Sequence, residues 1–347
     1  MKHQTLSKII AIGFAAALLT GCNDTESASQ TASDALAAGD YETAVQVASS
    51  AIESGAGDKQ LYRAKAIALL ARGDYEQAES TFLQAFSCSN GFIDRFDIDS
   101  SYYMAVAQFK KGEHAQAKET LDSIIALRPK EDGAYYLRGK VELAMQDKES
   151  ALADFDRTVT LAPENYDRYV GIYEDLHSRG YDGEASSYLE KAMSAGNKLS
   201  DYNKGVLEYY LGSYTDARND LENARKKTDN ENLTLYLGKT YEALGDDGYA
   251  MSIYEEFVRL NPNAGRIYDQ LASCQIKKGD YEGALTTIES GLSLGGGDGM
   301  QGLMFNRVVA YERSYDFAKA KKAMDEYLKL YPNDETAVRE NVFLSSR

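Results

Sequence analysis

The chain has 347 residues, of which 44% are hydrophobic and 27% are charged, and it contains 26 tyrosines, four prolines and no tryptophan. This composition supplies enough apolar surface for a core and excludes a disordered chain. The formal net charge of −16 argues against nucleic acid as a partner, because a polyanionic backbone would be repelled. We expect one uniform, helix-rich architecture.

Residues 1–21 have the layout of a secretory signal. Lys2 and Lys8 accompany an apolar run, Ile9 to Leu19, that is too short to span a bilayer as a helix. The run ends in the letters LTGC, which resemble the lipobox of bacterial lipoproteins. The resemblance implies that Cys22 is acylated, becomes the mature N-terminus and anchors the protein to a bacterial membrane, on its extracytoplasmic face. An ordinary signal peptide or an uncleaved anchor would leave unexplained why the run stops at this cysteine.

Residues 22–33 form the lipidated cysteine and a polar tether in this interpretation. The letters NDTESASQTAS, from Asn23 to Ser33, show no apolar period. We therefore expect a flexible segment that holds the folded part close to the membrane.

Residues 34–333 repeat with a period near 34. The stretch GDYETA at Gly39 returns as GDYEQA at Gly73 and GDYEGA at Gly279, and each start is followed five residues later by an alanine. The nine starts are Gly39, Gly73, Gly112, Gln146, Gly180, Gly212, Gly245, Gly279 and Tyr315. The four prolines check this register independently, because each stands 17 residues after a start; they are Pro129, Pro163, Pro262 and Pro332.

This pattern resembles the tetratricopeptide repeat, and the unit that matches it best runs from Leu237 to Pro262. The resemblance implies an all-α fold, a right-handed superhelical solenoid of about nine helix-turn-helix units. We expect residues 334–347 to form a capping helix on the last unit. Two joints depart from the pattern: five extra residues around Ser87 to Ser100 predict a longer loop or helix end, and the glycines of Gly295 to Gly299 suggest a loosened joint.

Each recurring residue has a mechanical explanation. The turn glycines allow a left-handed residue at the end of the first helix, and Asp40, Asp74 and Asp280 are expected to cap the second helix. The alanines let the two helices approach closely, and the prolines end the second helix. Cys88 and Cys274 lie about five repeats apart, so we expect two unpaired, mostly buried thiols.

Catalysis and cofactor binding find no support in the motifs, so we predict that the chain is not an enzyme. His3, His114 and His177 stand in no catalytic motif. The letters GGGDG lack the Lys-Ser/Thr of a phosphate loop. Asp94, Asp97 and Asp99 have oxygen ligands but not the spacing of a calcium loop, so no metal site is predicted.

The remaining candidate is a binding surface. In tetratricopeptide proteins the first helix of each unit lines a concave groove, and mapping that face onto this sequence gives Arg63, Tyr102, Phe109, Tyr136, Lys140, Tyr202, Tyr209 and Phe305. Each of these could instead pack in the core or between repeats. In the doublets Tyr102-Tyr103, Tyr135-Tyr136 and Tyr209-Tyr210 we expect one ring to be core and the other to be available, because neighbours on a helix point about 100° apart.

A protein or peptide partner is the function that this surface predicts. The Lys and Asn clamp by which some family members hold a chaperone's terminal carboxylate is absent. The alternative is capture of a glycan or another small ligand by tyrosines that stack on sugar rings. Aromatic and acidic residues clustered in adjacent units would favour that alternative, whereas aromatics spread over several units favour an extended peptide.

Overall fold

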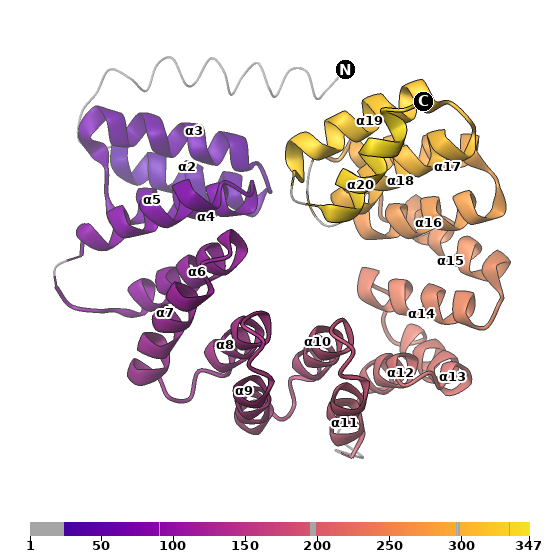
Figure 1. Ribbon diagram of the computed structural model, residues 1–347, viewed down its shortest axis with the longest axis horizontal. Coiled ribbons are helices and arrows are strands. Elements are labelled where there is room, and N and C mark those ends of the chain that lie inside the picture. The colour runs from indigo at the N-terminus through magenta and orange to yellow at the C-terminus, as the bar shows by residue number, and fades with distance from the viewer. Residues whose placement is uncertain (1–23, 90, 195–198, 296, 298, 333) are drawn as a thin grey trace. The chain divides into compact units, whose positions relative to one another are not determined.

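The computed structural model describes residues 24–89, 91–194, 199–295, 297, 299–332 and 334–347. The predicted signal segment and Cys22 lie outside these residues. The described chain forms nineteen α-helices and a short π-helical segment, Ile52–Ala56, and shows no strand (Figure 1). None of the described helices is both long and apolar enough to cross a bilayer. The predicted all-α repeat fold is confirmed.

The chain divides into two units, residues 1–154 and 155–347. The first holds α2 (Asp24–Ala37), α3 (Tyr41–Ala51), α4 (Lys59–Ala71), α5 (Tyr75–Ser87), α6 (Arg95–Lys111), α7 (His114–Leu127) and α8 (Asp132–Ala144). Helix α9 (Lys148–Leu161) crosses the division. The second holds α10 (Tyr166–His177), α11 (Asp182–Met193), α12 (Asp201–Tyr210), α13 (Tyr214–Arg225), α14 (Glu231–Ala243), α15 (Asp247–Leu260), α16 (Gly265–Lys278), α17 (Tyr281–Leu292), α18 (Met300–Arg313), α19 (Phe317–Leu330) and α20 (Glu335–Leu344).

The turn between the two helices of each repeat lies where the sequence predicted it. All nine starts have positive φ angles, from 62° at Tyr315 to 89° at Gly112, and Gln146 adopts 65°. The alanine five residues later is fully buried in every repeat: Ala44, Ala78, Ala117, Ala151, Ala185, Ala217, Ala250, Ala284 and Ala320. The left-handed residue ends the first helix, and the alanine lets the second helix pack closely against it.

The predicted helix ends are confirmed with one exception. The four prolines each stand two residues beyond the last residue of α7, α9, α15 or α19. Asp40 accepts a hydrogen bond from the Thr43 amide at 3.0 Å, and Asp280 caps α17 in the same way. Asp74 makes no such cap. Its carboxylate lies 3.3 Å from Nε of Arg72, which competes with the helix amides for the same oxygens.

The tether predicted for residues 22–33 is wrong over the residues that the structure describes. Helix α2 begins at Asp24, and Ala32 is fully buried against Val47, Ala48 and Leu61. Ala28 and Leu36 pack beside it, so small and apolar residues recur every four positions. The first helix therefore starts at residue 24, and its packed residues begin at Ala28, before residue 34.

The longer step between the second and third repeats contains both a loop and an extended helix. Helix α5 ends at Ser87, and the 17-residue helix α6 begins with a capping box formed by Asp94 and Asp97. Lys59 lies 3.0 Å from the Asp94 carboxylate and 2.6 Å from that of Asp97, so these acids are held by a lysine. Cys88, at the exposed end of α5, contradicts the expectation of burial, whereas Cys274 is buried; both thiols are free.

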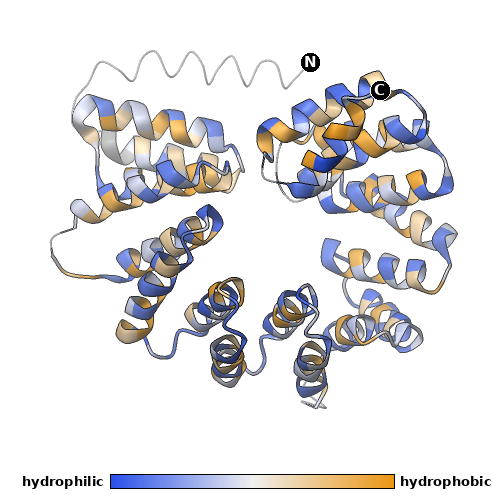
Figure 2. Cartoon of the chain, in the orientation of Figure 1, coloured by the Kyte–Doolittle hydropathy of each residue, from blue (hydrophilic) through white to orange (hydrophobic). Residues whose placement is uncertain are grey.

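Successive repeats in the second unit contact one another through their first helices, α10 with α12, α12 with α14, α14 with α16 and α16 with α18. Figure 2 shows apolar and polar residues alternating along the helices, as expected for helices with one packed face. Tyr254 of α15 is fully buried, and a Cβ at Gly238 of α14 would come within 2.2 Å of its ring. At the end of the chain, α20 packs on α19 through Ala337 and Leu344, as predicted for a cap.

Candidate functional site

Five tyrosines from three successive first helices meet in the second unit and form what we call the tyrosine cluster: Tyr173, Tyr202, Tyr209, Tyr210 and Tyr236. The ring centroids of Tyr209 and Tyr210 are 5.3 Å apart, and each lies 5.9 Å from Tyr236. Tyr173 lies 5.3 Å from Tyr210, and Tyr202 lies 6.4 Å from Tyr236. All five of these contacts are edge-to-face, which aromatic quadrupoles favour.

Hydrogen bonds fix part of this cluster and leave another part open. The Tyr210 hydroxyl donates to Oε1 of Glu174 at 2.5 Å and lies 3.2 Å from the Tyr236 hydroxyl. In the part of the chain that the structure describes, the hydroxyls of Tyr202 and Tyr209 have no hydrogen-bond partner and are not sealed from solvent. These two phenols can therefore donate to a ligand.

Burial sets the charge state of the cluster. It raises the pKa of the phenols of Tyr202, Tyr209, Tyr210 and Tyr236 above the ordinary value of 10.0. Each phenol therefore keeps its proton at physiological pH and serves as a neutral donor. The cluster presents apolar area and hydroxyl groups without adding negative charge to an acidic protein.

A lysine and an arginine stand beside the tyrosines. Burial lowers the pKa of Lys239, one turn after Tyr236 on α14, and the positive charge of Arg266 lowers it further. Among the described residues no acceptor forms a hydrogen bond or ion pair with the Lys239 amine. The Arg266 guanidinium donates to Asn232 at 2.6 Å. Burial raises the pKa of Asp269, whose carboxylate accepts from Asn306 at 2.8 Å. Lys239 is thus a basic side chain of this face with no partner among the described residues.

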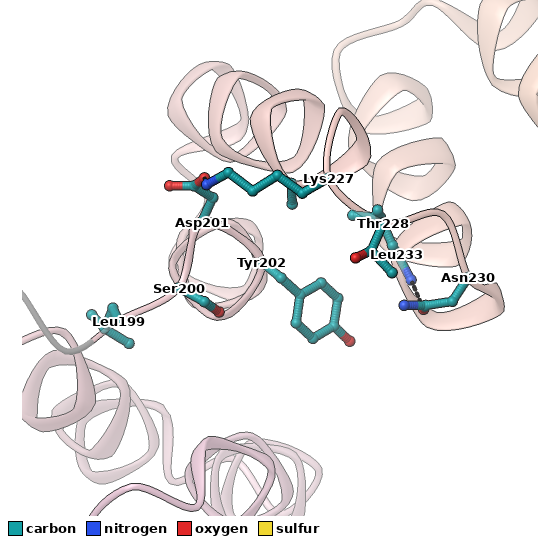
Figure 3. Close-up of a pocket in the computed structure, with 9 residues that line it drawn as sticks. Leu199, Ser200, Asp201, Tyr202, Lys227, Thr228, Asn230 and Leu233 are labelled. Atoms are coloured by element: carbon teal, nitrogen blue, oxygen red, sulfur yellow. Dashed lines mark hydrogen bonds and ion pairs between the residues drawn. The ribbon is translucent and has the colours of Figure 1, made fainter.

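A small pocket adjoins the cluster at the first turns of α12 and α14. It encloses about 290 Å³ and is lined by Leu199, Ser200, Asp201, Tyr202, Ala224, Lys227, Thr228, Asn230 and Leu233. Figure 3 shows the Tyr202 ring on one side and Lys227 reaching to Asp201 on the other, where the two form an ion pair at 2.5 Å. Tyr202 therefore belongs both to the pocket and to the tyrosine cluster.

The residues predicted for the groove have different surroundings. Tyr202 and Tyr209 lie in the cluster. Tyr102 donates to the Gly133 carbonyl at 2.9 Å and packs on a core, and Phe109 packs on that core as well. Phe305 contacts Tyr327, 5.6 Å between ring centroids, at the last core of the chain. Tyr102 thus connects two repeats, whereas Phe305 packs against the second helix of its own repeat.

The remaining candidates carry charge next to an aromatic ring. The Lys140 amine lies 5.3 Å from the Tyr136 ring centroid. Arg63 lies against two rings of α6. Cys22 falls outside the described residues, so its acylation stays a prediction.

Sequence reasoning missed Tyr173, Tyr210, Tyr236 and Lys239 as members of one site. In the doublet Tyr209-Tyr210 both rings contact Tyr236, but the Tyr210 hydroxyl is held by Glu174.

Comparison with known proteins gives the family and the fold. A family model described as a tetratricopeptide repeat matches residues 30–90, 102–166 and 202–265, and a second model with the same description matches residues 303–334. Yeast Tom70 is 15% identical, with a TM-score of 0.52 over 93% of this chain and 81% of that one. A tetratricopeptide repeat protein from Parabacteroides merdae is 15% identical, with a TM-score of 0.47 over 83% and 99%. No curated protein matches the sequence.

Proposed function

Because this chain belongs to the tetratricopeptide repeat family, whose helical fold is suited to protein interaction, we propose that it is a scaffold that binds a protein or peptide partner. The observation that carries the proposal is the tyrosine cluster. Five rings from α10, α12 and α14 meet on the helices through which successive repeats contact one another. A segment laid across these helices would contact all three repeats.

The chemistry of the cluster suits an extended peptide. Tyrosine offers apolar area at a small cost in side-chain entropy, and its hydroxyl can donate to a backbone carbonyl. Tyr202 and Tyr209 have such hydroxyls, and the Lys239 amine adds a positive charge to the same face. The partner's side chains would supply apolar contacts to the rings and a carbonyl or carboxylate to Lys239.

The proposal includes a location, the extracytoplasmic face of a bacterial membrane. It is supported by the LTGC sequence that ends at Cys22, directly after a short apolar run. Since α2 begins at Asp24, the folded part would start two residues beyond the lipid anchor. Mass spectrometry of the mature chain should find an acylated Cys22 at the N-terminus. A chain that keeps Met1 would refute the anchor.

One observation favours a second candidate, capture of a glycan. The structure brings Glu174 together with tyrosines of adjacent repeats, which is the aromatic and acidic grouping that sugar binding uses. Glu174 is, however, held by the Tyr210 hydroxyl. An extended peptide can contact the open hydroxyls of Tyr202 and Tyr209 and the Lys239 amine without breaking this hydrogen bond. A sugar that binds Glu174 would have to displace it.

Affinity capture with the full chain distinguishes binding of a protein partner from capture of a glycan. The wild type, a Tyr202→Ala/Tyr209→Ala double variant and a Tyr249→Ala control on the second helix α15 are immobilised and exposed to envelope extract. We expect one protein to be retained by the wild type and the control and lost from the double variant. Retention of soluble cell-wall fragments, with no protein that depends on Tyr202 and Tyr209, would refute the scaffold.

A further inference from the structure

Arg63 of α4, in the first unit, lies between two aromatic side chains of α6. Its guanidinium carbon is 4.6 Å from the ring centroid of Phe96 and 5.5 Å from that of Tyr103. The Tyr103 ring in turn stacks on Phe82, with 6.5 Å between centroids and 8° between planes. The rings therefore fix the guanidinium in place, and Phe82 fixes one of the rings.

The hydrogen-bonding capacity of Arg63 is unused within the described residues. Its Nε is buried and has no hydrogen-bond partner, and no described carboxylate forms an ion pair with the guanidinium. Two other basic residues of α4 and its end do form ion pairs. Arg72 pairs with Glu42 at 2.9 Å, and Lys59, one turn before Arg63, pairs with Asp94 and Asp97. Arg63 is therefore left without an acid although Lys59 and Arg72 in the same unit each have one.

The geometry defines what could bind there. Aromatic rings attract a guanidinium through its face, and the N–H groups in its plane stay directed at other acceptors. Two parallel N–H groups match the two oxygens of a carboxylate. Tyr103 keeps 37% of its surface exposed, so a side chain next to that carboxylate would find apolar area beside Arg63.

We propose that Arg63, Phe96 and Tyr103 form a binding site for the side-chain carboxylate of an Asp or Glu in a peptide whose neighbouring residues are apolar. The net charge of −16 disfavours a polyanion and allows a single carboxylate. This inference adds a second contact region, in the first unit, to the scaffold proposed above, and it rests on that function only in taking the ligand to be a peptide.

The probe is a pair of immobilised peptide pools, acetylated and amidated so that no terminal charge remains. Each pool holds short, mixed apolar sequences, with a central Glu in one pool and a central Gln in the other. The fluorescently labelled full-length protein is compared with Arg63→Gln, Arg63→Lys and Arg72→Gln. Arg72→Gln is the matched control, because it removes the same charge from the same unit at a paired position.

We expect the wild type and Arg72→Gln to bind the Glu pool about tenfold more tightly than the Gln pool. Arg63→Gln should lose this preference. Arg63→Lys retains the charge and the contact with the rings but lacks the paired N–H groups, so it should also lose most of the preference for the Glu pool. This second variant keeps the test valid if Arg63→Gln proves unstable.

Equal binding of the two pools, binding to neither, or a Glu preference that persists in both Arg63 variants would overturn the inference. These outcomes leave the scaffold function intact, because that function is tested at Tyr202 and Tyr209 in the other unit. Conversely, a Glu preference that depends on Arg63 would stand even if the tyrosine cluster bound nothing.

Discussion

The hydroxyl of Tyr210 on α12 donates a hydrogen bond to Oε1 of Glu174 on α10, with 2.5 Å between the oxygens. The same hydroxyl lies 3.2 Å from that of Tyr236 on α14. One phenol thus links the first helices of three successive repeats, at the centre of the face proposed to bind a partner.

Tyr210→Phe removes both bonds and keeps the ring. We expect a loss of about 1 kcal/mol in the free energy of unfolding, because Glu174 is exposed and the net value of such a bond is modest. Thermal melting followed by circular dichroism measures the change. Tyr249→Phe is the control, since the Tyr249 hydroxyl forms no hydrogen bond within the described residues. Equal melting temperatures for the two variants would contradict the link between repeats.

Gly238 gives a second prediction, on packing. A methyl group at this position would lie 2.2 Å from the ring of fully buried Tyr254, so Gly238→Ala should destabilise the protein by about 3 kcal/mol. Gly248→Ala is the matched control in α15, where a Cβ meets no atom within 4 Å. Because alanine has a higher helix propensity than glycine, Gly248→Ala should stabilise the protein by about 0.5 kcal/mol. Urea denaturation separates the two, and effects of the same sign would refute the packing.

A third prediction concerns the left-handed residue at the turn of each repeat. Gln146 has φ 65°, so Gln146→Gly should relieve strain and stabilise the protein by about 0.5 kcal/mol. The reverse change, Gly112→Gln at φ 89°, should cost about 1 kcal/mol, although a Cβ there has open space around it. Melting temperatures that move in the same direction for both variants would show that backbone conformation does not control these positions.

The C-terminal cap gives a prediction about pH. Burial raises the pKa of Glu312 on α18 to about 7, and the nearby Glu340 of α20 raises it too. The folded chain therefore holds a proton that the unfolded chain releases near pH 4.5. Stability should fall as the pH rises from about 4.5 to about 7 and change no further above that, by on the order of 1 kcal/mol after allowing for solvent.

Glu312→Gln tests this pH dependence because it removes the titrating group and keeps its shape. Melting temperatures measured from pH 5 to pH 8 should fall less in Glu312→Gln than in the wild type. Glu335→Gln, an exposed change in the first turn of α20, should leave the wild-type slope unaltered. Identical slopes in the wild type and Glu312→Gln would assign the pH dependence to other groups.

The repeat joints could be predicted from the sequence because each requirement is local. A left-handed residue, a small residue five positions later and a helix-ending proline are set by backbone geometry alone, and they located even the turn at Gln146. Helix α2 was missed because Ala28 and Ala32 are weakly hydrophobic, and their four-residue spacing becomes meaningful only when Val47 and Leu61 cover them.

The candidate site was predictable only in part. Periodicity places Tyr202 and Tyr209 on the first-helix face, but whether a ring there packs or stays available depends on the next repeat. Phe109 and Tyr102 are covered by a neighbouring core, whereas Tyr209 meets Tyr236. That difference arises from contacts between repeats, which one sequence does not reveal.

Photocrosslinking in living cells tests whether the tyrosine cluster contacts a protein partner. A benzoyl-phenylalanine replaces Tyr209 in the tyrosine cluster or, as the control, Tyr249 on α15, in the full-length chain. We expect illumination to join one protein partner to position 209 and not to position 249, and we expect Lys239→Gln to weaken the adduct. Adducts of equal yield at both positions, or no adduct at position 209 in cells that contain the folded protein, would contradict binding at the tyrosine cluster.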